Sequence, residues 1–407
     1  MNLQGKLYGE VIGELKARKS KDPDLNSAHL FGLVYPTGRE DIESLVSEVS
    51  QMYLFENALN PFKFPELAHL EEEVITTVSN LLSRKETSRR GGAMTSGGTE
   101  SILLSMNVHK ARACAKGIKS PKIVAATSAH PAYAKAASYF DLELIQIPLD
   151  NSFRPDLDAL KEAVTEQTAV VIASAFCYPY GVMDQVEEIA SIAQSVGAGC
   201  HVDACIGGFV LPFLERLGKE VPPFDFRVPG VTSISADVHK YGYVPKGASV
   251  ILYRDDDWMD HQVFLYDKWG SGLYGSASIA GARPGAPIAT SWAVMAYLGV
   301  TGYCELMKSV MTVSDQFSDL VRSTDQVELV GNPIGPVVAL QSDQLDLFGV
   351  GETMEKKGWH LNRNTSPRGL HLMFSPIHEK VIDALCSDFE EAVNNHENAN
   401  SEQARYS

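Results

Sequence analysis

The sequence is short of positive charge. Its 407 residues carry 35 lysines and arginines against 51 aspartates and glutamates, so the formal net charge at pH 7 is −16. A chain of this sign is repelled by nucleic acid and by anionic membrane surfaces, and the charge argues against both as partners. Any anionic substrate must therefore be met by cations placed locally.

Cysteine is also sparse, and no long apolar run occurs. The six cysteines form no Cys-x-x-Cys pair and no metal-ligand cluster with histidine, which predicts reduced thiols in a cytoplasmic protein and no metal site. No stretch reaches the roughly 18 apolar residues of a membrane span, and the N-terminus lacks a signal-peptide pattern. We therefore expect no integral membrane segment.

The organisation of the chain is typical of an α/β protein. From about residue 65 to 254, β-rich segments alternate with helical periodicity, which predicts a mostly parallel sheet between helices. Two amphipathic helices are expected at 3–19 and 41–54, and an α+β pattern follows residue 290. The predicted parts are an N-terminal helical arm, a large domain, a small C-terminal domain and a disordered tail, over 1–60, 61–290, 291–394 and 395–407.

Lys240 is the first candidate for chemistry. It follows an apolar, β-branched stretch that begins at Ser233, so we expect it at the end of a strand and directed into a cleft. A lysine in catalysis acts mainly as an amine that condenses with a carbonyl, and pyridoxal phosphate is the cofactor that most often requires it. Alone, a His-Lys pair after a strand is usually a helix cap and a solvated charge.

A glycine-rich turn, Thr95-Ser-Gly-Gly-Thr-Glu-Ser101, precedes a long helical pattern over 102–115. Free N–H groups and the positive end of a helix provide a seat for a phosphate, and small residues allow a ligand close approach. Ser96 and Thr99 can add hydroxyl donors to the N–H groups around Gly97 and Gly98. Taken by itself, the motif also fits an ordinary capped helix start.

Asp203 ends the apolar strand that is expected at 199–203. A buried carboxylate beside a pyridine nitrogen keeps that nitrogen protonated, so that the ring can accept electrons. A strand-end aspartate that caps the next turn is the alternative. These motifs follow one another along the chain in the order of the glycine-rich turn, Asp203 and Lys240, and this order favours a pyridoxal phosphate site. His130 follows another expected strand and is placed to stack on the cofactor ring.

With these residues in place, the sequence resembles the sphingosine-1-phosphate lyase family, within the fold type I pyridoxal phosphate enzymes. The resemblance implies retro-aldol cleavage of a phosphorylated long-chain base to an aldehyde and phosphoethanolamine, by a homodimer with its sites at the subunit interface. Eukaryotic members carry a membrane anchor that we do not find here, so a bacterial-type enzyme is expected. The matching stretches run from about Leu30 to about Arg363 and include 94–103, 128–130, 136–140, 201–205, 223–228, 233–248 and 279–285.

The resemblance also implies roles for residues that composition does not single out. His239 would contact the cofactor phosphate, Tyr180 would lie near the reacting carbon, and Lys246 would bind the substrate phosphate. A loop over 269–285 would be lent to the neighbouring subunit's site. Further residues implied at the cofactor or the substrate phosphate are Tyr35, Asn57, Tyr274, Ser276 and Arg283, with Asn60 replacing a family histidine.

Two other readings remain open at this point. A pyridoxal phosphate decarboxylase of the glutamate or aromatic type shares the phosphate seat, the aspartate and the His-Lys pair, but requires arginine for a carboxylate. The Pro245-Lys-Gly247 and Arg283-Pro-Gly285 motifs favour the lyase. A catalytically silent homologue would have lost Lys240 or Asp203, and both are present.

Overall fold

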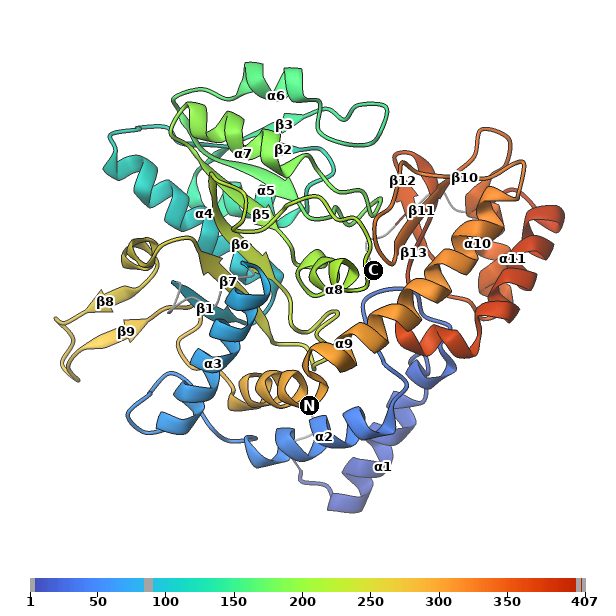
Figure 1. The fold of residues 1–407 in the computed structure, drawn as a ribbon. Coiled ribbons are helices and arrows are strands. Elements are labelled where there is room, and N and C mark those ends of the chain that lie inside the picture. The colour runs from blue at the N-terminus through green and yellow to red at the C-terminus, as the bar shows by residue number, and fades with distance from the viewer. Residues whose placement is uncertain (1–3, 84–90, 400–403, 405–407) are drawn as a thin grey trace.

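A computed structural model describes residues 4–83, 91–399 and 404. Its centre is a seven-stranded sheet in which all strands but one run in the same direction (Figure 1). Only β7 is antiparallel, and it lies between β1 and β6. The strand order is β1-β7-β6-β5-β4-β2-β3, with bounds Gly92–Thr95, Ser249–Tyr253, Val231–Ala236, Gly199–Asp203, Thr168–Ser174, Lys122–Ala126 and Glu143–Ile147.

Helices cover both faces of this sheet, because its central strands are apolar on both sides. Every residue of β4, β5 and β7 is buried, as is typical of a sheet between helical layers. Alternate residues serve opposite faces: Ile123 of β2 packs with α4 and α5, whereas Val124 joins the core beneath α7. The helices are α3 Pro65–Leu81, α4 Gly98–Ala115, α5 Ala132–Phe140, α6 Leu157–Ala163, α7 Val186–Ser195 and α8 Leu211–Arg216.

A small domain follows the long helix α9, Gly285–Arg322, which runs between the two domains (Figure 1). Gly299, with φ 52°, interrupts the helical backbone of α9. The α+β pattern expected after residue 290 is present as a four-stranded antiparallel sheet with two helices beside it. The domain comprises β10 Glu328–Leu329, β11 Val337–Gln341, β12 Asn362–Thr365, β13 Arg368–Met373, α10 Leu347–Lys356 and α11 Ile382–Asn395.

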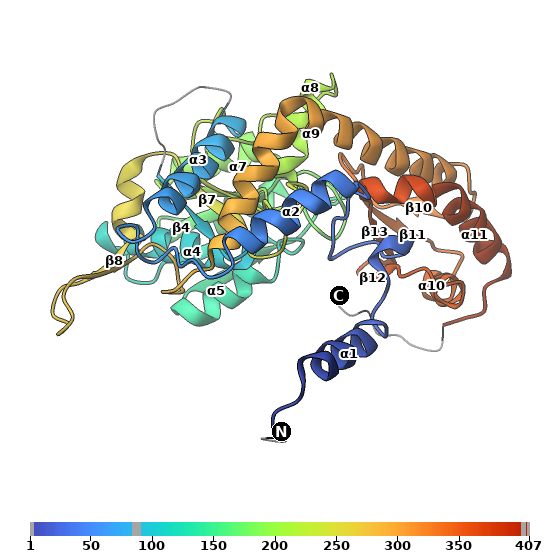
Figure 2. The same cartoon turned by 90° about the horizontal axis from the view of Figure 1, so that it is seen from below.

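The N-terminal arm contains the two expected helices, α1 Tyr8–Lys19 and α2 Glu40–Met52. Figure 2 shows α1 projecting from the body of the molecule, and none of its residues is buried. In contrast, α2 packs against α9. Between the two helices, Phe31 is fully buried and stacks on His378 of the small domain, with ring centroids 4.2 Å apart.

The remaining elements lie outside both layers. A short hairpin, β8 Phe264–Tyr266 and β9 Tyr274–Ser276, projects from the large domain. After α11, residues 396–399 return to α10, where the Ala399 N–H donates to Asp346; most of the predicted disordered tail lies outside the described residues. In the part of the chain that the structure describes, no helix combines the length and apolar character of a membrane span.

The burial of Phe31 makes a prediction about stability. Phe31→Ala should lower the free energy of unfolding by about 3–5 kcal/mol, because it leaves a cavity between the arm and the small domain. Phe62→Ala is the matched control, since its side chain is 93% exposed, and it should change stability by less than about 0.5 kcal/mol. Denaturant titration of both variants measures the difference, and equal stabilities would contradict the packing described.

Candidate active site

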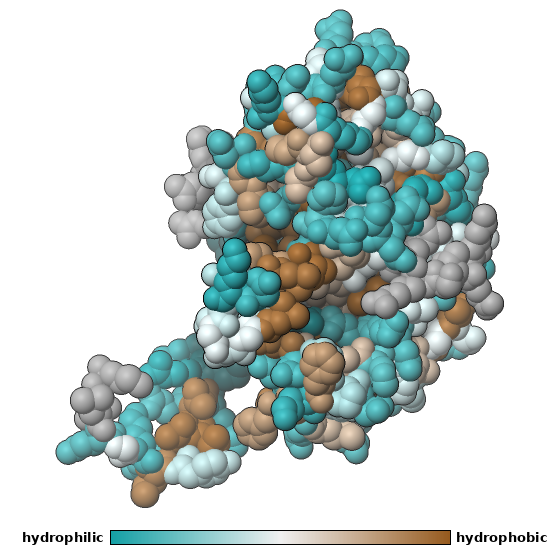
Figure 3. Space-filling view, turned by 90° about the vertical axis from the view of Figure 1, so that its left-hand side faces the viewer, coloured by the Kyte–Doolittle hydropathy of each residue, from teal (hydrophilic) through white to brown (hydrophobic). Residues whose placement is uncertain are grey.

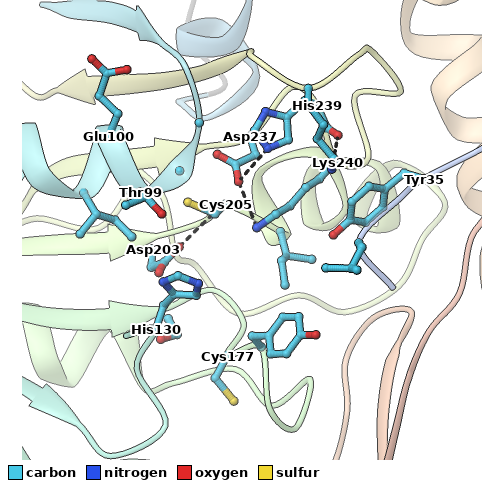
Figure 4. Close-up of a pocket in the computed structure, with 18 of the residues that line it drawn as sticks. Tyr35, Thr99, Glu100, His130, Cys177, Asp203, Cys205, Asp237, His239 and Lys240 are labelled. Atoms are coloured by element: carbon cyan, nitrogen blue, oxygen red, sulfur yellow. Dashed lines mark hydrogen bonds and ion pairs between the residues drawn. The ribbon is translucent and has the colours of Figure 1, made fainter. Parts of the chain in front are cut away.

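A cavity of about 380 Å³ lies where the carboxyl ends of the central strands meet the N-terminus of α4 (Figure 4). This is the edge at which ligands bind in open α/β sheets. Most of the predicted cofactor residues line it, together with several that were not predicted. The lining residues are Leu33, Tyr35, Ser96–Glu100, Ile102, His130, Ser174, Phe176–Tyr178, Asp203, Cys205, Ile206, Asp237, His239, Lys240 and Lys246.

Lys240 follows β6, in a turn that brings its amine toward Asp237 (Figure 4). The Lys240 Nζ lies 3.0 Å from Asp237 Oδ2, and the Asp237 side chain is only 2% exposed. Burial lowers the pKa of Lys240, but the Asp237 carboxylate outweighs it and the pKa is raised well above its usual value. Burial likewise opposes ionisation of Asp237, yet the charge of Lys240 keeps its pKa lowered.

Asp237 was missed in the sequence, although a signal was present. It stands three residues before Lys240, directly after an apolar strand. A carboxylate at that spacing reaches back to the lysine when the chain forms a turn. The Oδ1 atom of Asp237 is buried and has no hydrogen-bond partner among the described residues, so this carboxylate can accept a further donor from a bound group.

Asp203 ends β5 at the same edge of the sheet. Its Oδ1 accepts the Cys205 N–H at 3.1 Å, and its Oδ2 accepts the Tyr133 hydroxyl at 3.3 Å. These two donors fix the orientation of the carboxylate. His130 lies beside it in Figure 4, and the His130 Nδ1 accepts the Ala132 N–H at 3.1 Å. Burial lowers the pKa of His130 although Asp203 opposes this, so the ring is neutral at pH 7.

The sequence predicted a phosphate-binding site at the first turn of α4, and this turn lines the cavity. Its N–H groups at Gly98 and Thr99 have no partner within the helix, as is general for helix starts. A Cβ on Gly98 would lie 2.7 Å from Cys205 Sγ and 2.8 Å from both Asp237 oxygens. A side chain therefore has no room there, and glycine is required for α4 to approach the sheet this closely.

Ser96 was predicted to donate to a phosphate, but its donors are bonded to another side chain. Its N–H and its hydroxyl both donate to Glu100 Oε2, at 2.7 and 2.6 Å. Both donors of Ser96 are thus already engaged. A phosphate bound here would consequently depend on the backbone of Gly97, Gly98 and Thr99. The ring of His239 lies 3.3 Å from the position of a Cβ on Gly97.

Lys246 lies at the side of the cavity, next to Tyr35. Its Nζ is 4.6 Å from the centre of the Tyr35 ring and donates to the His239 carbonyl at 3.3 Å. Burial, with the charge of Lys240 adding to it, lowers the pKa of Lys246 to about 8. Burial also lowers the pKa of His239 to about 4, so Lys246 is the cation and His239 a neutral neighbour.

Of the two tyrosines after β4, Tyr178 and not Tyr180 is among the residues that line the cavity. The Tyr180 hydroxyl donates to the Ser366 carbonyl in the small domain, and its ring packs against Phe153 at 5.2 Å. The turn after β4 directs the two tyrosines differently: Tyr178 lines the cavity, whereas Tyr180 points toward the small domain. Both tyrosines belong to one Cys-Tyr-Pro-Tyr-Gly motif, so the sequence alone does not indicate which of them faces the cavity.

Besides Tyr180, five predicted residues lie away from this cavity within one chain. Ser276 and Arg283 line a second cavity of about 440 Å³, which also borders α3 and β1. The Arg283 guanidinium is paired with Glu71, with Nη2 to Oε2 at 2.9 Å. Asn57 accepts the N–H groups of Leu59 and Arg283, Asn60 accepts those of Phe62 and Lys63, and Tyr274 packs against Phe264 and Trp269.

Comparison with known proteins agrees with this geometry. Residues 26–342 match the model of the pyridoxal-dependent decarboxylase conserved domain. A sphingosine-1-phosphate lyase of Arabidopsis thaliana is 40% identical over 390 residues, which span 94% of this chain and 72% of that protein. The structure of a sphingosine-1-phosphate lyase of Burkholderia pseudomallei superposes with a TM-score of 0.92 and 33% identity, covering 97% of this chain and 92% of that one.

This chain belongs to the sphingosine-1-phosphate lyase family. A glutamate decarboxylase of Lactobacillus brevis has a TM-score of 0.84 at 19% identity, over 98% of this chain and 96% of its own, so that likeness shows the fold alone. The chain is a pyridoxal phosphate-dependent lyase, and its residues fit the cofactor. Gly98 allows the start of α4 to lie against Asp237 and Cys205, and the cavity lies beside Lys240 and Asp203. Among the described residues Asp237 Oδ1 is buried without a hydrogen-bond partner, so it can accept a donor from a bound group.

The buried Lys240–Asp237 pair predicts a shift in the pH dependence of cofactor uptake. Lys240 reacts as a neutral amine, and Asp237 holds it in the charged form. Asp237→Asn removes the carboxylate, so burial should lower the pKa of Lys240. The rate at which apoprotein takes up pyridoxal phosphate, followed by absorbance across a pH series, should then reach its plateau about one pH unit or more lower.

The matched control is Asp325→Asn, an exposed residue of the small domain. It should leave the pH profile of cofactor uptake unchanged. If the Asp237→Asn profile coincides with that of the control, Asp237 does not govern the protonation of Lys240.

Proposed function

We propose that this lyase cleaves phosphorylated long-chain bases such as sphingosine 1-phosphate to a long-chain aldehyde and phosphoethanolamine. The observation that carries the proposal is the position of Lys246, whose residue is exposed as a whole but whose side chain lines the cavity that contains Lys240. The described lining residues include these two lysines and no arginine. A decarboxylase needs arginine for the substrate carboxylate, whereas an ammonium point charge suits a phosphate.

The residues divide the work between binding and chemistry. Lys246 and Tyr35 would hold the substrate phosphate, and Lys240 would bind the cofactor covalently until substrate amine replaces it. When bound, pyridoxal phosphate accepts the electrons released as the bond between substrate C2 and C3 breaks. Asp203, fixed by Tyr133 and the Cys205 N–H, would hold a proton on the ring nitrogen, and His130 would cover the face of the ring.

Proton movement at the substrate C3 hydroxyl requires a group at the cavity surface. The freed Lys240 amine qualifies, and so does the Tyr178 hydroxyl, because both line the cavity. Tyr180 would need to break its hydrogen bond to Ser366 before it could act. We therefore propose Lys240 or Tyr178 for this step rather than Tyr180.

We also propose a homodimer in which each chain lends the 269–285 loop to its neighbour's site. The β8–β9 hairpin and this loop expose large apolar side chains: Phe264, Leu265, Trp269, Leu273 and Ile279 are between 56% and 72% exposed. Figure 3 views the face from which the hairpin projects, and apolar side chains gather at its centre. A second copy that covers them would place Tyr274, Ser276 and Arg283 beside another cavity.

A cytoplasmic location fits the thiols. All six cysteines are unpaired, and Cys177, Cys200 and Cys205 are buried, as in proteins that fold under reducing conditions. Subcellular fractionation of the native host, with the protein followed by antibody, tests this part of the proposal.

The reaction itself is tested by its products. Purified protein with pyridoxal phosphate should convert sphingosine 1-phosphate to an aldehyde and phosphoethanolamine in equal amounts, and Lys240→Ala should abolish both. Borohydride should fix the cofactor on Lys240. Carbon dioxide released from amino acids, with no aldehyde from the phosphorylated base, would establish the decarboxylase reading instead.

Lys246 predicts both the substrate preference and a pH limit. A charge-assisted contact to phosphate is worth about 1.5–3 kcal/mol, so Lys246→Ala should lower kcat/KM for sphingosine 1-phosphate roughly ten- to a hundredfold. For an unphosphorylated amine the same change should matter little. The pKa of Lys246 is about 8, so its charge is present below that pH and kcat/KM should fall as the pH rises through it.

Lys246→Arg is the control, because arginine stays charged across this range. Its kcat/KM should lose the decline above pH 8 even if the absolute value is lower. Steady-state kinetics of the three proteins from pH 6 to 9.5 provide the measurement. Identical profiles for wild type and Lys246→Ala would show that other groups hold the phosphate.

A further inference from the structure

Glu100 connects two parts of the molecule that have separate roles. It is a buried carboxylate, 8% exposed, in the first turn of α4. Its Oε2 accepts both Ser96 donors at the phosphate seat. Its Oε1 accepts the N–H of Ile279 at 2.8 Å, 179 residues further along the chain. One side chain thus joins the cofactor seat to the 269–285 loop.

The loop around Ile279 is compact and is fastened at few places. Ser276 donates to the carbonyl oxygens of Ser278 and Ala280, which closes the loop on itself. Gln262 donates to the Ala277 carbonyl. The Ile279 side chain is 57% exposed, so this segment presents its surface outward while its backbone is held from behind by Glu100.

We propose that Glu100 is a positioning residue that couples cofactor binding in one site to the placement of the loop that completes the neighbouring site. The inference rests on the proposed function for its second half, because the loop must serve the partner's site. A phosphate on the N–H groups of Gly98 and Thr99 lies next to Ser96 and competes with Glu100 for the Ser96 hydroxyl.

Competition for the Ser96 hydroxyl determines whether cofactor binding tightens or loosens the loop. When Ser96 turns to a phosphate, Glu100 loses a hydrogen bond on Oε2, and the remaining charge is compensated more strongly by the Ile279 N–H on Oε1. Cofactor binding therefore tightens the loop. Because linkage between binding free energies is reciprocal, a firmly placed loop also favours cofactor binding in its own chain.

Hydrogen exchange tests the coupling without any turnover. In the wild type, adding pyridoxal phosphate should slow amide exchange in the peptide that covers 276–283 by about threefold or more. In Glu100→Gln this cofactor-dependent slowing should be lost, because a neutral amide is a weaker acceptor for Ile279. Glu328→Gln, an exposed residue of β10, should behave like wild type.

Hybrid dimers test whether Glu100 of one chain affects the active site of the neighbouring chain. A Lys240→Ala chain paired with a wild-type chain, isolated through two different affinity tags, has a single working site. In the test hybrid the Lys240→Ala chain also carries Glu100→Gln, so the working site keeps an intact Glu100 of its own and borrows only the altered loop. The kcat/KM of this hybrid should be at least about fivefold below that of the first.

The outcomes separate the inference from the function on which it depends. Equal activities in the two hybrids, or a cofactor-dependent slowing of exchange that persists in Glu100→Gln, would overturn the coupling and leave Glu100 as a helix cap. The shared site is checked with a Lys240→Ala chain paired with an Arg283→Ala chain. If that pair, isolated with the same tags, regains no activity although both chains fold, the loop is not lent to the partner, and the proposed dimeric site fails rather than Glu100.

Discussion

The close approach of α4 to the carboxyl edge of the sheet is the constraint on which the site depends. Gly98 allows it, since any side chain there would overlap Cys205 and the carboxylate of Asp237. The approach places the free N–H groups of a helix start within the same cavity as the residues that end β5 and β6. The helix start, Asp203 and Lys240, for which we propose contacts to the cofactor phosphate, ring nitrogen and aldehyde, are therefore neighbours because of one packing contact.

The two lysines of the cavity differ in their electrostatics. An acidic chain has brought two lysines into one cavity, and each is stabilised differently. Lys240 keeps its charge because Asp237 is 3.0 Å away, whereas Lys246 has only the Tyr35 ring and a carbonyl oxygen as close partners among the described contacts. Burial and the charge of Lys240 lower the pKa of Lys246. An arriving phosphate dianion gains more from Lys246 than from a cation that is already neutralised.

The same arrangement explains why several implied residues are absent from the cavity of a single chain. Ser276 and Arg283 open on a different cavity, and the hairpin beside them exposes apolar side chains that a monomer would leave in water. Their position is coherent if the loop acts on a neighbouring copy. Glu100 is then the residue that connects the loop to a cofactor seat within the chain.

The sequence by itself determined the layered α/β fold and the line of motifs along it, because period-two and helical patterns and a glycine-rich helix start are local properties. Lys240, Asp203 and the 97–99 turn were accessible in this way, and the comparisons confirmed the family and the cofactor. The tertiary structure decided the contacts between distant segments: Asp237 beside Lys240, Ser96 held by Glu100, and Tyr178 rather than Tyr180 in the wall. Side-chain direction after a turn depends on what packs around it, and that information is spread over the whole chain rather than written in the motif.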